Sequence, residues 1–167
     1  MCQEQIIDEY VQKALNIFKS ANIVLPNEAT VNIYHHCGKE HINETGAMFI
    51  NIVNRDYCKS YVIMLPHEEY PNHYHRIKTE SFYVLHGDLH VIVDGEKTEL
   101  AAGDMMHVDR GQDHSFGNNG GVVFEETSTM YVPNDSIYLD AEVQHTTYDQ
   151  RRTTSKQRTG KSYGKNG

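Results

Sequence analysis

The sequence has no tryptophan, only four prolines and only three cysteines among its 167 residues. Cys2, Cys37 and Cys58 are odd in number, far apart and without C-x-x-C spacing, so they do not predict a disulfide framework. Unpaired thiols of this kind are typical of a reducing compartment, and we therefore expect a cytoplasmic protein.

Long apolar runs are missing as well. No stretch approaches the ~18–20 consecutive apolar residues that a membrane span needs, and the first residues lack the basic start and apolar run of a signal peptide. We expect no contact with a membrane. The length suits one domain with a single core, since domains cluster at roughly 100–150 residues, and it argues against a large multidomain enzyme.

Basic residues are scarce in most of the chain. The sequence holds 15 Lys and Arg against 23 Asp and Glu, a net charge of −8, yet six of the basic residues fall within residues 151–167, where no acidic residue occurs. We predict residues 151–167 to be a basic flexible tail, because such a segment buries little apolar surface. The acidic remainder repels phosphate, so we expect no nucleic-acid partner.

One helix and a series of short strands are predicted. Apolar side chains recur every three to four residues over 4–19, which indicates a helix that packs, with the linker in residues 1–30, on the rest of the domain. Short strands with Gly-, Asn- and Asp-rich turns then indicate a mainly-β antiparallel sandwich or barrel over residues 31–150. The predicted strands are 31–34, 47–53, 61–65, 81–85, 89–93, 105–108 and 122–126.

Histidine is abundant, with 11 residues, and three positions in the middle of the chain have the spacing of metal ligands. His73 and His75 are two residues apart, so on a strand they point to the same face about 6.5–7 Å apart. Glu80 opens the next predicted strand, and a hairpin would return its carboxylate to the same place. Two imidazoles and one carboxylate suit a divalent first-row metal with positions left open for a substrate.

A second segment, from Gly103 to Asn118, has the spacing G-x5-DRG-x2-H-x3-N. Together with the segment around His73 and His75, it resembles the paired motifs of the cupin superfamily over roughly residues 60–128. The resemblance implies a double-stranded β-helix, which is a small jelly-roll barrel, and it adds His114 as the fourth metal ligand.

Two positions depart from the cupin motifs. His67 stands where the first motif has glycine, and Asp109 stands where the second has proline. Both are turn positions rather than ligands, so the implied metal site is unaffected.

A narrower resemblance concerns the chemistry. The pattern H-x-H-x2-K-x-E that ends at Glu80, followed by Glu126-Thr127-Ser128 and Asn134-Asp135, is similar to cupin sugar isomerases of the D-lyxose ketol-isomerase type. It implies that Lys78 and Glu126 carry out the proton chemistry and that the metal is Mn²⁺, with Zn²⁺, Fe²⁺, Co²⁺ or Ni²⁺ as alternatives. Glu125 stays an alternative to Glu126, because strand alternation sends only one of two neighbouring side chains inward.

A competing resemblance covers about residues 31–140. The runs Tyr34–Gly38, Asn54–Cys58 and Lys78–Leu89 are similar to the cupin module of sialic-acid-type synthases, which implies a sugar ligand without turnover. A cupin dioxygenase would use the same ligand set on iron and is a third hypothesis.

We favour an aldose–ketose sugar isomerase that acts through an enediolate, with D-lyxose/D-xylulose or D-mannose/D-fructose as substrate pairs. The reaction needs a metal as Lewis acid, a carboxylate that moves a proton and a cation beside the developing oxyanion. No cluster of arginines and lysines awaits a phosphate inside the predicted barrel, which favours a free sugar. A homodimer is expected, because exposed edge strands need cover.

Overall fold

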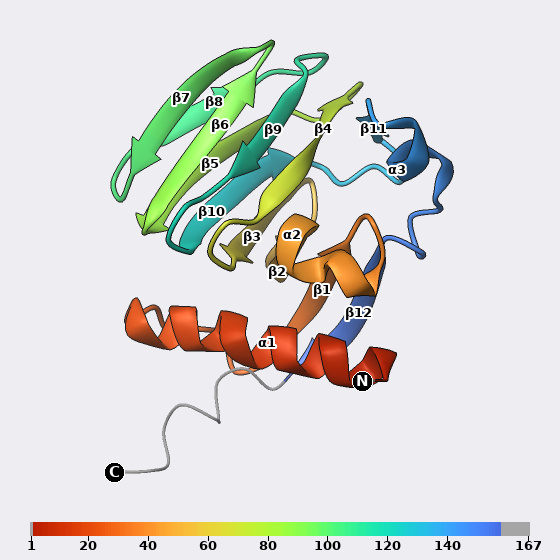
Figure 1. Ribbon diagram of the computed structural model, residues 1–167. Coiled ribbons are helices and arrows are strands. Elements are labelled where there is room, and N and C mark those ends of the chain that lie inside the picture. The colour runs from red at the N-terminus through yellow and green to blue at the C-terminus, as the bar shows by residue number, and fades with distance from the viewer. Residues whose placement is uncertain (1, 158–167) are drawn as a thin grey trace.

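The computed structural model describes residues 2–157, in which two antiparallel sheets face each other (Figure 1). The larger sheet has the strand order β12-β1-β2-β3-β10-β5-β8, and the smaller has the order β11-β4-β9-β6-β7. The strands are β1 (Ala29–His35), β2 (Gly46–Asn54), β3 (Tyr57–Met64), β4 (Glu69–His75), β5 (Glu80–His86), β6 (Asp88–Val93), β7 (Glu96–Ala101), β8 (Met105–Val108), β9 (His114–Gly117), β10 (Val122–Thr129), β11 (Ser136–Tyr138) and β12 (Arg152–Gln157). The helices are α1 (Gln3–Ser20), α2 (Ile42–Thr45) and α3 (Ala141–His145), with a 3-10 turn η1 (Lys39–His41) before α2.

The predicted mainly-β barrel with an N-terminal helix is confirmed, and each predicted strand overlaps an observed one. The list of predicted strands omitted β4, β7, β9, β11 and β12, although His73 and His75 of β4 were expected on a strand. β7 lies at a sheet edge and buries only Leu100, and β9 and β11 have four and three residues. Such strands are held by backbone pairing with their neighbours, so their own sequences carry little apolar periodicity.

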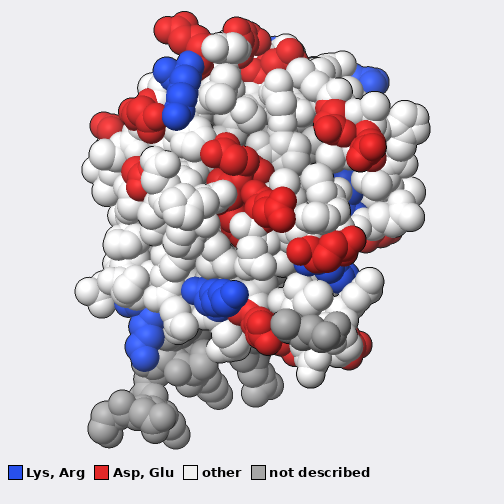
Figure 2. Space-filling view, in the orientation of Figure 1, with Lys and Arg blue, Asp and Glu red and all other residues white. Residues whose placement is uncertain are grey.

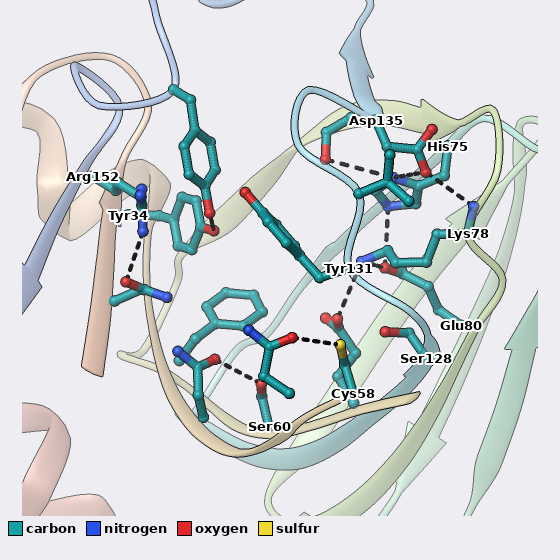
Figure 3. Close-up of a pocket in the computed structure, with 18 of the residues that line it drawn as sticks. Tyr34, Cys58, Ser60, His75, Lys78, Glu80, Ser128, Tyr131, Asp135 and Arg152 are labelled. Carbon is teal, nitrogen blue, oxygen red and sulfur yellow. Dashed lines mark hydrogen bonds and ion pairs between the residues drawn. The ribbon is translucent and has the colours of Figure 1, made fainter. Parts of the chain in front are cut away.

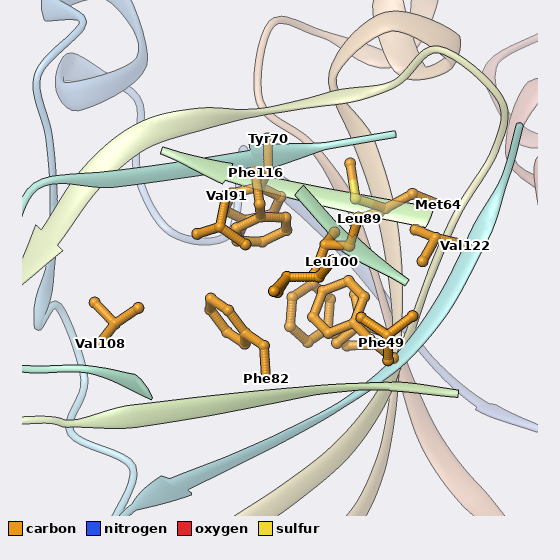
Figure 4. Packing of buried hydrophobic residues seen from close by; sticks show 14 of the residues in the cluster. Phe49, Met64, Tyr70, Phe82, Leu89, Val91, Leu100, Val108, Phe116 and Val122 are labelled. Atoms are coloured by element: carbon orange, nitrogen blue, oxygen red, sulfur yellow. The ribbon is translucent and has the colours of Figure 1, made fainter. Parts of the chain in front are cut away.

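Aromatic side chains from both sheets meet in the space between them (Figure 4). Phe82 of β5, Phe116 of β9 and Phe124 of β10 are at most 2% exposed, and their ring centroids are 5.4–5.5 Å apart in edge or tilted contacts. Such contacts stabilise a core beyond the burial of apolar area. Phe116 also lines the main pocket, so the core forms the floor of that pocket.

Helix α1 covers the outer face of the larger sheet (Figure 1). Tyr10, Ala14 and Phe18 are buried along one side of the helix and belong to one apolar cluster with Val31 of β1 and Ile50 of β2. The helix is amphipathic, as its sequence predicts, because only this side meets the sheet.

The prediction of a flexible tail is wrong for residues 152–157, and residues 158–167 lie outside the described part of the chain. Residues 152–157 form β12, which pairs antiparallel with β1 at the edge of the larger sheet (Figure 1). The barrel therefore begins at Ala29 and continues beyond residue 150. A basic, polar segment can do this because an edge strand needs backbone partners and β-compatible residues such as Thr153 and Thr154, not an apolar face.

Acidic side chains are spread over the face seen in Figure 2, and basic side chains are fewer there. None of the helices in residues 2–157 is long and apolar enough to cross a membrane.

One buried carboxyl group lies beneath α1. Glu68 is fully buried, its Oε2 accepts hydrogen bonds from the Tyr10 hydroxyl at 2.9 Å and the Leu65 N–H at 2.6 Å, and its Oε1 has no partner within residues 2–157. Burial raises the pKa of Glu68 to about 8. The protonated form is therefore favoured in the folded protein.

This carboxyl group makes stability depend on pH. At pH values between 4.5, the ordinary pKa of a glutamate, and about 8, Glu68 is ionised in the unfolded chain but protonated in the folded protein. The free energy of unfolding therefore falls as the pH rises through this range. We expect the Tm of the wild type to fall by several degrees more between pH 5 and pH 8 than that of Glu68→Gln, which stays neutral. Thermal unfolding followed by circular dichroism measures this.

Glu9→Gln, at an exposed position of α1, serves as the matched control and should keep the wild-type pH dependence. Equal pH dependence of Glu68→Gln and the wild type would show that Glu68 ionises normally in the folded protein.

Candidate active site

Three histidines meet between two neighbouring strands. His73 and His75 lie on β4, His114 opens β9, and the register of this pair places His73 opposite His114. Each histidine is at most 3% exposed, and one ring nitrogen from each lies within 4.8 Å of the others. The spacing of two residues on β4 puts both side chains on the same face of the sheet, as the sequence predicts.

Glu80 reaches the histidines from the first position of β5. Its Oε1 is 3.1 Å from Nε2 of His75, and its Oε2 is 3.3 Å from Nε2 of His114. The structure thus brings together the four residues that the sequence singles out as ligands.

The donor set fits a divalent metal. Nδ1 of His73 lies 2.9 Å from the Pro71 carbonyl, and Nδ1 of His114 lies 3.0 Å from the Gln112 carbonyl. Since a carbonyl only accepts, Nδ1 carries the proton in both rings and Nε2 keeps its lone pair. Beyond their ion-pair contacts with the Glu80 carboxylate, Nε2 of His75 and of His114 has no hydrogen-bond partner in residues 2–157. Burial, and then the neighbouring imidazoles, hold the pKa of His73 well below its usual range, so that its ring stays neutral.

Beside the histidines lies a chain of three charges, of which Glu80 is buried and Lys78 and Glu126 are partly buried. The Lys78 ammonium forms one ion pair with Glu80 (Figure 3). It forms another with Glu126, whose Oε1 is 3.4 Å from Nζ. Burial alone would lower the pKa of Lys78, but the two carboxylates outweigh burial and raise it, so Lys78 keeps its charge. Burial, and then the charge of Glu80, raise the pKa of Glu126 above its ordinary value.

The structure places the two candidate carboxylates of β10 on opposite faces of the strand. Glu126 lines the pocket, whereas Glu125 forms an ion pair with Lys59 at 2.8 Å and is absent from the pocket wall. Of the two, only Glu126 faces the histidine cluster.

The charges and histidines lie at one end of a cavity of about 280 Å³. Polar side chains of the larger sheet form one wall, in which the Ser60 hydroxyl donates to Oδ1 of Asn51 at 3.0 Å. At the far side, Nη1 of Arg152 donates to Oδ1 of Asn32 at 2.9 Å. In Figure 3, Tyr131 lies between the Arg152 side and the Lys78 side of this pocket.

Aromatic side chains form the wall around Arg152. Its guanidinium lies 3.8 Å from the centroid of the Tyr148 ring, and the Tyr148 hydroxyl is 3.4 Å from that of Tyr34. The rings of Tyr131 and Tyr148 are 6.3 Å apart. The segments after β10 and before β12 therefore complete the pocket.

The sequence analysis did not predict that Asn32, Asn51 and Arg152 line the pocket. Asn32 and Asn51 interrupt buried apolar runs, and a polar residue among buried neighbours is a signal that could have marked them. Arg152 had no such signal, because only the pairing of β12 with β1 brings it to the pocket.

Residues 60–130 match the family model described as the cupin domain. The cupin fold predicted from the two motifs is confirmed.

The proteins that this chain resembles include sugar isomerases. The chain is 30% identical over 107 residues to the D-lyxose/D-mannose isomerase of Thermosediminibacter oceani, a match that covers 59% of each protein. It is 40% identical over 45 residues to quercetin 2,3-dioxygenase of Bacillus subtilis, which covers 27% of this chain and 13% of that enzyme. The chain thus matches less than two thirds of the length of either relative.

A solved structure shares the fold over most of the chain. L-ribose isomerase of Cellulomonas parahominis superposes with a TM-score of 0.70, covering 84% of this chain and 94% of that one at 16% identity. At this identity the likeness shows the fold alone. The sequence match to the D-lyxose/D-mannose isomerase confirms the predicted resemblance to cupin sugar isomerases.

We predict that removing one imidazole abolishes metal binding. His75→Ala should lose most of its bound Mn²⁺ and the rise in Tm that added metal produces, because metal binding is coupled to folding. Elemental analysis and thermal unfolding measure both. His107→Ala, which changes an exposed histidine of β8, should behave as the wild type. Equal metal content in His75→Ala and His107→Ala would contradict the assignment.

Proposed function

We propose that this cupin is a metal-dependent aldose–ketose isomerase that acts on a free sugar through an enediolate, with D-lyxose/D-xylulose or D-mannose/D-fructose as candidate pairs. The observation that carries the proposal is that a three-histidine, one-carboxylate cluster lies beside the partly buried Lys78–Glu126 pair at the wall of one pocket. The similarity to a D-lyxose/D-mannose isomerase supports it.

His73, His75, His114 and Glu80 would hold the ion, for which we propose Mn²⁺ within the class of divalent first-row metals. When bound, such an ion supplies Lewis-acid polarisation of the carbonyl and hydroxyl oxygens at C1 and C2 of the sugar.

Glu126 is the proposed general base. It takes the proton from C2 of the aldose and returns it to C1, while a proton moves from O2 to O1, so that atoms balance between aldose and ketose. A base works best when its pKa is near the working pH. Burial moves the pKa of Glu126 in that direction.

Lys78 is the proposed electrostatic partner. Its ammonium keeps its charge between Glu80 and Glu126 and so can stabilise the negative charge that develops on the substrate oxygen. A side chain already held in place needs little reorganisation during the reaction.

The polar wall of Asn32, Asn51 and Ser60 offers hydrogen-bonding groups for the remaining hydroxyls of a sugar. Arg152 is the one basic side chain at that side of the described pocket lining, and it is engaged with Asn32 and, at 3.4 Å, with Asp149. This supports a free sugar rather than a sugar phosphate.

We also propose a homodimer, which sedimentation equilibrium would test.

Glu126→Gln is the direct test of the general base. We expect kcat for ketose formation from D-lyxose or D-mannose to fall roughly 10²–10⁴-fold, the usual contribution of a positioned base, with unchanged Mn²⁺ content. Glu125→Gln, one residue away on the outer face, should keep the wild-type kcat.

Equal losses in Glu126→Gln and Glu125→Gln would contradict the role of Glu126. A wild-type protein that binds these sugars and converts neither would contradict the isomerase and favour the binding module.

A further inference from the structure

A buried carboxylate outside the proposed catalytic set holds the loop that carries Lys78. Asp135, between β10 and β11, is 6% exposed. Its Oδ1 accepts the backbone N–H groups of Arg76 and Ile77, each at 3.1 Å, and its Oδ2 accepts the N–H of Lys78 at 2.9 Å. Three consecutive donors thus converge on one side chain.

The loop held in this way joins two proposed ligands. It comprises residues 76–79, between His75 at the end of β4 and Glu80 at the start of β5. Its last residue, Thr79, is tied to Thr129 of β10 by two hydrogen bonds of 3.2 Å. Asp135 is the side chain that holds the other three positions.

The chemistry of the contact requires a carboxylate. An ionised carboxylate has two accepting oxygens and makes stronger hydrogen bonds to N–H groups than a neutral acceptor does. An asparagine amide would keep one oxygen and turn an NH₂ group toward one of the donors. Buried N–H groups that lose their acceptor are costly, so the loop would move.

A movement of this loop would above all displace the Lys78 side chain. The Lys78 ammonium must sit between Glu80 and Glu126, and its backbone N–H is one of the three that Asp135 holds. A displacement of about 1 Å in a catalytic group can cost on the order of 100-fold in rate.

We propose that Asp135 is a positioning residue, which sets the Lys78 ammonium between Glu80 and Glu126 by holding the backbone of residues 76–78. The role in turnover rests on the isomerase proposed above, whereas the placement of Lys78 can be tested without it.

The first test measures the accessibility of Lys78 to an amine-acylating reagent by peptide mass spectrometry, on the full chain loaded with Mn²⁺. In Asp135→Asn, Lys78 should be acylated roughly tenfold faster than in the wild type. Lys59, which is paired with Glu125 on the outer face, is the internal control and should keep its rate.

Asp140→Asn is the matched variant. Asp140 also accepts two backbone N–H groups, at the start of α3 and outside the pocket, so this change should leave the Lys78 rate unchanged. An unchanged Lys78 rate in Asp135→Asn, or an equal rise at Lys59 and Lys78, would overturn the proposal.

The second test is a double-mutant cycle on kcat. Asp135→Asn should lower kcat roughly 10–100-fold with a smaller change in KM, and it should have no further effect in a Lys78→Met background, because both changes remove the same contribution. Additive losses would overturn the proposal. If the wild type has no isomerase activity, the proposed function fails, while the acylation test still decides the placement of Lys78.

A third measurement needs no variant. Hydrogen exchange of the wild type should show the amides of residues 76–78 protected from solvent at least 100-fold relative to an unstructured peptide. Exchange at the unstructured rate would show that Asp135 does not hold the loop, even if Asp135→Asn fails to fold.

Discussion

The ion pair between the buried Glu80 carboxylate and the Lys78 ammonium connects the histidine cluster with Glu126. Glu80 faces two imidazoles on one side and Lys78 on the other, and Lys78 in turn reaches Glu126. Buried charges are tolerated only when they are paired, since removing one partner of such a pair costs about 3–5 kcal/mol. The two carboxylates outnumber the ammonium by one, so the cluster favours a further cation, as a metal centre requires.

The barrel supplies this arrangement through strand register. The β4–β9 pair sets His73 against His114. The pairing of β10 with β5 sets Ser128 opposite Glu80, with Glu126 two residues before Ser128 on β10. Short strands with fixed alternation hold these side chains on the inner face. The apolar floor around Phe116 excludes water from below, which strengthens the electrostatic interactions above it.

Local spacing accounts for what the sequence could predict. His73, His75 and Glu80 follow from their spacing and a hairpin turn. His114 was implied by the resemblance to the second cupin motif, and helix α1 follows from its apolar period. The choice between Glu125 and Glu126 could not be made, because Val122, Val123 and Phe124 before them are all buried and show no alternation. Arg152 and Asp135 reach the pocket only through contacts between segments far apart in sequence, which spacing does not encode.

The central claim is that this pocket moves a proton between two neighbouring carbons of a sugar. The most direct measurement is NMR of the Mn²⁺-loaded protein with D-lyxose and with D-mannose in D₂O. Because a carboxyl proton exchanges with solvent, transfer by Glu126 should place deuterium at C1 of the ketose product. Absence of any ketose, or ketose without deuterium at C1, would contradict the account.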